Sequence, residues 1–471
     1  MGLALGPMSK VLSIYLELIN RIRVAAGKRR LSVDEVPVYM TKATAPLVLT
    51  LAPVLYHLAR SGSNSLIYVA PLLCLASILA PVLVEGVSYG RYVRNLREDL
   101  MYFMLVEGVS PGDDLVRDLE EGSEDMCAQL ETLCNEHRRL KLFLRFFPGM
   151  RGIREYVLRA PKPMRRTLLE YIMVRETGNF NTWVYSKFQE ALHELRASAK
   201  RSLELKTLLT LLATVFSGLP PPLIALVMSL GGGIPPYFYP ALFLPGILLV
   251  VSESSTPRLM RVSSRDRGAW VATSLRTLAL LLVPAIGTSI YLLAVGVALC
   301  ALGSVATVRF ARTYAKVLSL PLRLVSLADR IPYSRDPTGL VEENLGSLRN
   351  SSTLASLCYI ILMRSIKQGN VNTARIVAFK EVVEELFSLV RQGAVVRSLV
   401  LATALILPFT LSYSISLAMV VVPEAFGIRA FCFASSLFYS IIATWVAFGS
   451  YDNGLLVGSV LLLLYALGVV P

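Results

Sequence analysis

Long apolar runs alternate with long polar stretches along the whole chain. The apolar runs cover residues 43–84, 207–251, 277–308, 398–448 and 455–470. A bilayer core is about 30 Å thick and takes about 20 apolar helical residues to cross. The first four runs therefore predict helical hairpins, and the last predicts a single span. We expect an all-α polytopic membrane protein with about nine transmembrane helices.

The polar stretches predict the parts outside the membrane. Residues 85–206 and 309–397 have helical periodicity and predict two cytoplasmic helical-bundle domains, while residues 1–42 predict a basic helix and residues 252–276 a basic loop. Lys and Arg collect in the cytoplasmic segments of membrane proteins. We therefore expect a multi-pass protein of the cell membrane, with its N-terminus in the cytoplasm and its C-terminus outside.

The run at 277–308 is too long for one ordinary span. Because basic segments flank both of its ends, the chain should cross an even number of times here. We interpret the run as two short helices that turn near Gly287 or a few residues later.

One stretch of sequence occurs twice. GNFNTWVYSKFQEALHEL begins at Gly178 and GNVNTARIVAFKEVVEEL begins at Gly369, an offset of 369 − 178 = 191 residues. The offset aligns Asn179 with Asn370, Asn181 with Asn372, Thr182 with Thr373, Phe188 with Phe379, Glu190 with Glu381, Glu194 with Glu385 and Leu195 with Leu386. Such a repeat indicates two copies of one structural unit.

Each copy predicts a turn followed by an amphipathic helix. Apolar residues recur at positions i, i+4 and i+7, and two glutamates occupy another face. The apolar positions are Phe188, Leu192 and Leu195 in the first copy and Phe379, Val383 and Leu386 in the second. A left-handed glycine suits the end of the preceding helix, and Asn181 or Thr182 suits the cap of the next.

The GNxNT turn has two interpretations. In the first, the turn simply ends one helix and begins the next, and backbone geometry alone then explains its glycine and its capping residues. The alternative is a corner that docks a partner protein. The partner-binding residues would then be Gly178, Asn179, Asn181, Thr182, Glu190, Glu194, Gly369, Asn370, Asn372, Thr373, Glu381 and Glu385.

The two copies are predicted to face the same way, because an even number of crossings lies between them. They would be related by an axis along the membrane normal, as in a parallel repeat. Each unit would consist of a hairpin, a cytoplasmic helical bundle and a second hairpin, with the span at 455–470 as an addition.

Composition agrees with the membrane prediction. Of the 471 residues, 54% are hydrophobic and 17% charged, and the mean hydropathy is +0.57, which is too apolar for an ordinary globular protein of this length. The net charge of +14 fits basic loops beside anionic lipid rather than nucleic acid, since no RNA-binding signature or zinc finger accompanies it. Within 85–206 acids precede bases, which suits either a solvated surface or docking to a large charged partner.

Signals for catalysis, metals and cofactors are weak. The sequence contains no GxxxxGK[ST], HExxH or CxxC. Its six cysteines are scattered and predict no disulfide framework. Cys127, Cys134 and His137 form at most a partial metal site, and an ordinary helix surface explains them as well. We expect no enzyme activity, no cofactor and no metal.

The architecture resembles the membrane platform of the type II secretion F family, in its archaeal type IV pilus and archaellum form. The resemblance rests on two polar helical domains in which a Gly turn precedes an amphipathic helix that runs into an apolar segment. These read GNFNT…FQEALHEL…TLLTLLATV and GNVNT…FKEVVEEL…SLVLATALI. The resemblance covers most of the chain from Ala43 to Pro471. The N-terminal forty residues and the long acidic-to-basic insert in the first polar domain do not map onto the family's pattern.

The resemblance implies a non-catalytic platform. Its partners would be a cytoplasmic hexameric secretion ATPase, pilin-like subunits and membrane lipids, with monomer and homodimer both open, and its role would be to couple the ATPase to filament assembly. The alternative from another class is a transporter or permease built from a parallel repeat. Against this alternative, the predicted spans hold almost no ionisable residue except His57.

Overall fold

The structure is a computed structural model that describes part of the chain. The described residues are 5–26, 28–41, 44, 66–110, 115, 124–218, 244–254, 257–260, 312–313, 315–349, 351–369, 372–392, 398–400, 402, 442 and 446. They are mostly helical, as the sequence predicts.

The chain divides into two compact units. The first contains Met1–Met104 and Gly112–Tyr185, and the second contains Leu105–Pro111 and Ser186–Pro471. Both units are interleaved in sequence, because the short segment Leu105–Pro111 belongs to the second unit although the chain on both sides of it belongs to the first.

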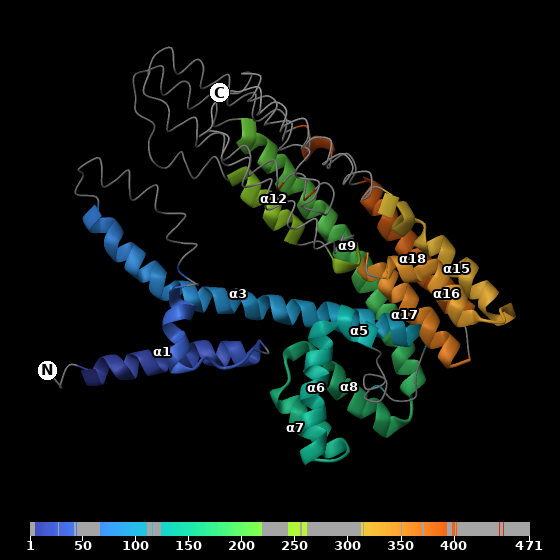
Figure 1. The fold of residues 1–471 in the computed structure, drawn as a ribbon, viewed down its shortest axis with the longest axis horizontal. Coiled ribbons are helices and arrows are strands. Elements are labelled where there is room, and N and C mark those ends of the chain that lie inside the picture. The colour runs from blue at the N-terminus through green and yellow to red at the C-terminus, as the bar shows by residue number, and fades with distance from the viewer. Residues whose placement is uncertain are drawn as a thin grey trace, which may run out of the picture. The chain divides into compact units, whose positions relative to one another are not determined.

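Helices of the first unit follow one another closely in sequence. They are α1 (Leu5–Ala25), η1 (Val33–Glu35), α3 (Leu66–Val109) as far as Met104, α5 (Glu124–Gln129), α6 (Glu131–Phe146), α7 (Met150–Arg159) and α8 (Lys162–Thr177). In Figure 1, α6, α7 and α8 lie together, each packed on the next. Their shared core contains the buried side chains Leu133, Leu140, Ile153, Tyr156 and Leu168.

Helix α1 is fastened to α3 by one buried carboxylate. The Glu85 side chain is 1% exposed, and it accepts hydrogen bonds from Arg23 Nη1 at 2.7 Å, Lys28 Nζ at 2.8 Å and Tyr39 Oη at 2.9 Å. Burial of Glu85 on its own would raise the pKa of its carboxyl, but the hydrogen bonds from Lys28 and Tyr39 and the two nearby cations outweigh burial. The pKa of Glu85 therefore lies below its usual range.

Helices of the second unit include both copies of the repeat. They are α9 (Phe180–Gly218) from Ser186 onward, α12 (Leu244–Ser254), η2 (Arg258–Met260), α15 (Leu320–Arg330), η3 (Ile331–Tyr333), α16 (Pro337–Leu345), η4 (Gly346–Leu348), α17 (Thr353–Lys367) and α18 (Thr373–Gln392). In Figure 1, α15 to α18 form one bundle, in which α15 packs on α18 and α16 packs on α17.

Side-chain caps define where two helices of this bundle begin. The Asp336 carboxylate accepts a hydrogen bond from the Gly339 backbone N–H at 2.8 Å at the start of α16. The Ser352 hydroxyl accepts one from the Ala355 backbone N–H at 3.0 Å at the start of α17. Both caps satisfy backbone donors that the first helical turn leaves unpaired. Helix α17 is buried around most of its circumference, including Leu357 and Ile361, which places it at the centre of the bundle.

The predicted fold class and location are wrong for the part of the chain that the structure describes. No helix among these residues is both long enough and apolar enough to cross a bilayer, against the expected nine transmembrane helices of a multi-pass cell-membrane protein. Helix α12, which overlaps the end of the predicted hairpin at 207–251, has 11 described residues, or about 16 Å of helix against about 30 Å of bilayer core. In α9 the charged residues continue to Lys206, and the helix ends at Gly218.

Other predicted spans cannot be compared residue by residue. The hairpin at 277–308 and the span at 455–470 lie outside the described residues, as do most of the hairpin at 398–448 and the first part of the hairpin at 43–84. Within α3, the side chains that the structure describes begin at Leu79, and charged residues appear from Glu85 onward.

Candidate partner-binding site

Both glycines of the repeat adopt the left-handed backbone conformation. Gly178 has φ +76° and follows α8, and Gly369 has φ +65° and follows α17. The Gly178 N–H donates to the Val174 carbonyl at 3.0 Å, and the Gly369 N–H donates to the Ile366 carbonyl at 3.0 Å. A side chain at either position would be strained, so glycine is required by the backbone. The predicted helix-terminating role of both glycines is confirmed.

The predicted cap at Asn181 or Thr182 is wrong, whereas Asn372, the counterpart of Asn181, caps the helix of the second copy. The Arg375 N–H donates to the Asn372 side-chain oxygen at 3.2 Å, and α18 begins at Thr373. In the first copy α9 already begins at Phe180, so Asn181 and Thr182 lie inside its first turn. Asn370 lies outside the described residues.

An aromatic cluster explains the earlier start of α9. The ring of Tyr171 in α8 lies 6.2 Å from the ring of Phe180 and 6.4 Å from that of Trp183. Aromatic pairs at such distances contribute about 0.5–1.5 kcal/mol beyond burial. The repeat offset places Val371 and Ala374 at the positions of Phe180 and Trp183, so the second copy has no such cluster to extend its helix.

The predicted apolar stripe is buried in both copies. Phe188, Leu192 and Leu195 of α9 are buried, as are Phe379, Val383 and Leu386 of α18. Both stripes belong to the second unit. The amphipathic interpretation of the repeat is therefore confirmed, and the stripes serve the core rather than a free surface.

The glutamates of the repeat lie on the outer faces of these helices. Glu190 forms an ion pair with Lys187 one turn earlier in α9, and half of the Glu190 side chain is exposed. Glu381 is exposed on α18, and Glu194 is partly exposed on α9. These acids are therefore accessible from solvent, as a docking surface would need.

One ion pair joins the two copies. The Arg196 Nε in α9 lies 2.8 Å from the Glu385 Oε2 in α18, and about half of each side chain is exposed. Exposed pairs of this kind contribute about 0–1 kcal/mol. Glu385 therefore has an intramolecular partner, which the sequence did not reveal because the two residues are 189 positions apart in the chain (385 − 196 = 189).

A buried carboxylate lies at the end of α3. Glu107 has no exposed surface, and both of its oxygens accept hydrogen bonds from the guanidinium of Arg364 in α17, with Nη2 to Oε2 at 3.0 Å. Ser110 next to it hydrogen-bonds the side chain of Gln368, and the Arg375 guanidinium donates to the Gly108 carbonyl at 2.8 Å. Segment Leu105–Pro111 is thereby held by side chains from both α17 and α18.

Sequence analysis missed this network, although one signal was present. Glu107 is the one charged residue in the run LMYFMLVEGV (100–109), and every described side chain from Leu100 to Ser110 is buried. A single carboxylate in such a run needs a charged partner, because burying it alone is costly. The pattern could have identified Glu107, but nothing local identifies Arg364 as its partner.

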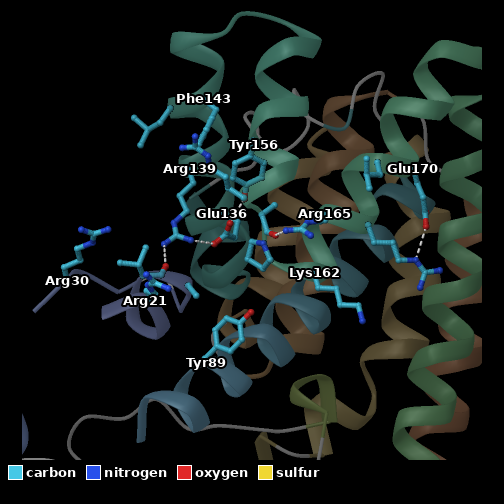
Figure 2. A pocket seen from close by; sticks show the side chains of 18 of the residues that line it. Arg21, Arg30, Tyr89, Glu136, Arg139, Phe143, Tyr156, Lys162, Arg165 and Glu170 are labelled. Atoms are coloured by element: carbon cyan, nitrogen blue, oxygen red, sulfur yellow. Dashed lines mark hydrogen bonds and ion pairs between the residues drawn. The ribbon is translucent and has the colours of Figure 1, made fainter. Parts of the chain in front are cut away.

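Another buried carboxylate, Glu136, belongs to the first unit. Glu136 of α6 has no exposed surface and accepts hydrogen bonds from the hydroxyls of Tyr92 and Tyr156 and from Arg139 Nη1 at 2.7 Å. Figure 2 shows Glu136 between Arg139 and Tyr156. Burial, together with the Glu136 charge, raises the pKa of both tyrosines. Both phenols are therefore protonated donors at neutral pH.

The chain contains two GxSxG sequences, a pattern that surrounds the nucleophile of many hydrolases. They run from Gly86 to Gly90 and from Gly108 to Gly112. In hydrolases such a sequence forms a sharp turn between a strand and a helix. Ser88 lies within the continuous helix α3, and the Ser110 hydroxyl is engaged by Gln368. Both serines are preceded by helical residues of α3, whereas a strand precedes the nucleophile in hydrolases with this sequence.

Cys127 and Cys134 form a disulfide between α5 and α6. The expectation of no disulfide framework is therefore corrected: the described residues contain this disulfide. Because Cys127 and Cys134 are bonded to each other, they do not form the partial metal site with His137 that the sequence suggested. Across the described ranges, no group of three or more His, Cys, Asp or Glu side chains is arranged to hold a metal ion.

No protein-family model, curated protein or solved structure matches the chain.

Proposed function

We propose that the chain is a non-catalytic platform that couples a hexameric secretion ATPase to the assembly of a type IV pilus-like or archaellum filament. The starting point is the family resemblance of the two repeat copies. Each copy has a Gly turn, a buried apolar stripe and glutamates on an outer face. Such helices offer a surface to a partner without losing their own packing.

Helix α9 carries this proposal. It runs for 39 residues without a break, from Phe180 to Gly218, which is about 58 Å of continuous helix. Glu190 and Glu194 lie near one end. A partner that pulls or turns this end can transmit displacement along the axis, because a helix held by backbone hydrogen bonds is stiff. A platform moved by an ATPase needs an element of this kind.

Proposed partner contacts are tested by charge reversal in both copies. The variants are Glu190→Lys with Glu194→Lys, and Glu381→Lys with Glu385→Lys. Each should reduce retention of the ATPase by the full-length tagged protein, and should reduce filament number in electron micrographs, at unchanged protein level. The matched control is Glu204→Lys with Glu343→Lys, which reverses two exposed glutamates on α9 and α16 outside the repeat positions.

Glu385 pairs with Arg196, so Glu385→Lys could act by loosening the two helices or by removing a contact with the ATPase. A charge swap separates these two roles. Arg196→Glu with Glu385→Arg keeps an ion pair between the helices but reverses the charge at both positions. If the swap restores full ATPase retention, Glu385 acts by stabilising the packing of α9 on α18. It would then not be part of the surface that contacts the ATPase. Normal filaments in both double variants would exclude the repeat helices, and a wild-type protein that retains neither ATPase nor pilin-like subunit would exclude the function.

A further inference from the structure

A basic groove crosses the first unit. It is bounded by α1, α3, α6, α7 and α8 and has a volume of about 1110 Å³. Seven of its lining residues are cationic, namely Arg21, Arg30, Arg139, Arg159, Lys162, Arg165 and Arg166, and only Glu136 and Glu170 are acidic. All belong to one unit, so the groove is a property of that unit alone. It does not involve the repeat helices.

Four of the seven cations are used within the unit. Arg165 donates to the carbonyls of Val157 and Leu158 at 3.1 Å each, so it caps the end of α7. Arg139 binds Glu136 at 2.7 Å and the Val24 carbonyl at 3.0 Å, which ties α6 to α1. Arg21 and Arg166 form ion pairs within their own helices, with Glu17 and Glu170. These four contacts stabilise the walls of the groove.

The other three cations have no carboxylate partner among the described side chains. Arg159 stacks over the Phe143 ring at 5.5 Å, and no hydrogen bond or ion pair within the described ranges engages the side chain of Arg30 or Lys162. Lys162 is the first residue of α8, where the helix dipole adds positive potential. In Figure 2, Arg30 and Lys162 lie on opposite sides of the Glu136 and Tyr156 cluster. The groove therefore presents unbalanced positive charge to solvent.

The groove also presents apolar side chains. Leu142 of α6 is 52% exposed, and Leu169 and Met173 of α8 are 44% and 58% exposed. Lys162, Arg166, Leu169 and Met173 follow a spacing of three or four residues, so they form one stripe along α8. This stripe changes from cationic at its beginning to apolar at its end.

We propose that this groove binds an acidic amphipathic helix of a partner polypeptide. Acidic side chains of such a helix would pair with Arg30, Arg159 and Lys162, and its apolar stripe would cover Leu142, Leu169 and Met173. This is the helix-in-groove mode of recognition, in which apolar anchors supply affinity and charges supply orientation. The exposed apolar side chains beside the cations favour an amphipathic polypeptide over a small anion.

The probe for the test is a fluorescent 18-residue synthetic peptide with Leu at positions i, i+3, i+4 and i+7, Glu on the opposite face and Ala at the remaining positions, so that it can form an amphipathic helix. Its binding to the full-length protein is followed by anisotropy. Comparison probes are a scrambled peptide of the same composition and inorganic polyphosphate. The proposal expects the patterned peptide to bind at least about tenfold more tightly than the scrambled one, since only the former aligns its apolar anchors.

Two pairs of substitutions separate the contribution of charge to peptide affinity from that of apolar contact. Arg30→Glu with Lys162→Glu should weaken binding of the patterned peptide by about tenfold or more, with the difference shrinking at high salt. The matched control, Arg138→Glu with Arg145→Glu, reverses two exposed cations of α6 that do not line the groove. Leu169→Ser with Met173→Ser should weaken binding several-fold at any salt concentration, whereas Leu158→Ser, exposed on α7 outside the groove, should not.

Three outcomes would overturn the proposal. Equal binding of patterned and scrambled peptides would show adsorption of negative charge without helix recognition. Displacement of the peptide by polyphosphate, with no effect of the Leu169 and Met173 changes, would identify a general anion site. Binding that appears only after the acids within residues 111–123 are changed to amides would assign the groove to this chain's own acidic segment.

Discussion

The guanidinium of Arg364 donates two parallel hydrogen bonds to the carboxylate of Glu107, with Nη2 3.0 Å from Oε2, although the two residues are 257 positions apart. Glu107 is fully buried and Arg364 is 16% exposed. A bidentate arginine–carboxylate pair fixes both distance and orientation. The pair therefore sets how the end of α3 fits against α17.

Removing one partner of this pair should be strongly destabilising. Glu107→Gln or Arg364→Met leaves a buried group without its charge partner, and each change should cost about 3–5 kcal/mol. Hydrogen exchange of the α17 and α18 amides, followed by mass spectrometry, measures the loss within the second unit. The double variant Glu107→Gln with Arg364→Met should be less destabilised than the sum of the two single changes, because the two side chains interact. Additive effects would show that the two side chains do not interact.

A close helix contact beside this pair gives a second prediction. A Cβ at Gly108 would overlap the Cβ and ring of Phe188, and the Phe188 side chain cannot rotate away because its own Cβ is part of the overlap. Gly108→Ala should therefore destabilise the second unit by about 1–3 kcal/mol. Gly90 lies in the same helix with nothing near the position of a Cβ. Gly90→Ala should be neutral or stabilising by up to about 1 kcal/mol, so equal effects of both changes would refute the contact.

Local features of the chain could be predicted where a single segment determines them. Gly178 and Gly369 end helices, and the stripes that start at Phe188 and Phe379 are buried, because turn geometry and helical periodicity depend only on neighbouring residues. The cap at Asn181 failed because aromatic packing on Tyr171 moved the start of α9. Tertiary contacts here overrode the local preference.

Long-range pairings could not be predicted in the same way. Arg196 with Glu385 and Glu107 with Arg364 depend on how distant helices pack, and one sequence does not show which charges meet. The membrane spans were predicted from apolar runs and hydropathy, and their orientation from the distribution of Lys and Arg. Among the described helices, apolar segments such as α12 are short, and the apolar part of α9 continues a charged helix. Mean hydropathy does not distinguish such helices from spans.

The attachment of α1 to α3 should depend on pH. The pKa of Glu85 is below its unfolded value of about 4.5, because burial is outweighed by the hydrogen bonds and charges of its partners. A carboxyl with a lowered folded-state pKa stabilises the protein above the unfolded pKa, and the contribution is lost as pH falls through the folded pKa. Wild type should therefore be more stable than Glu85→Gln at pH 7, and the difference in thermal unfolding should shrink below about pH 4.5.

The control for this pH dependence is Glu343→Gln, which changes an exposed carboxylate of α16. It should unfold like the wild type across the whole pH range. If the difference between wild type and Glu85→Gln were the same at pH 3 and pH 7, the charge of Glu85 would not contribute to the attachment of α1.

Alkylation of cysteines should distinguish the buried free thiol of Cys358 from the disulfide-bonded Cys127 and Cys134. Cys358 of α17 is fully buried, and burial raises the pKa of its thiol to about 12. Because the thiolate is the reactive form, iodoacetamide at pH 8 should not label Cys358 in the folded protein and should label it after unfolding in guanidinium. Cys127 and Cys134 should stay unlabelled in unfolded protein until a reductant opens their disulfide. Peptide mass spectrometry reads each position separately, and a Ser347→Cys variant on exposed η4 supplies a thiol that should react at once. Labelling of Cys358 as fast as this introduced thiol, without denaturant, would mean that α17 is not the centre of its bundle.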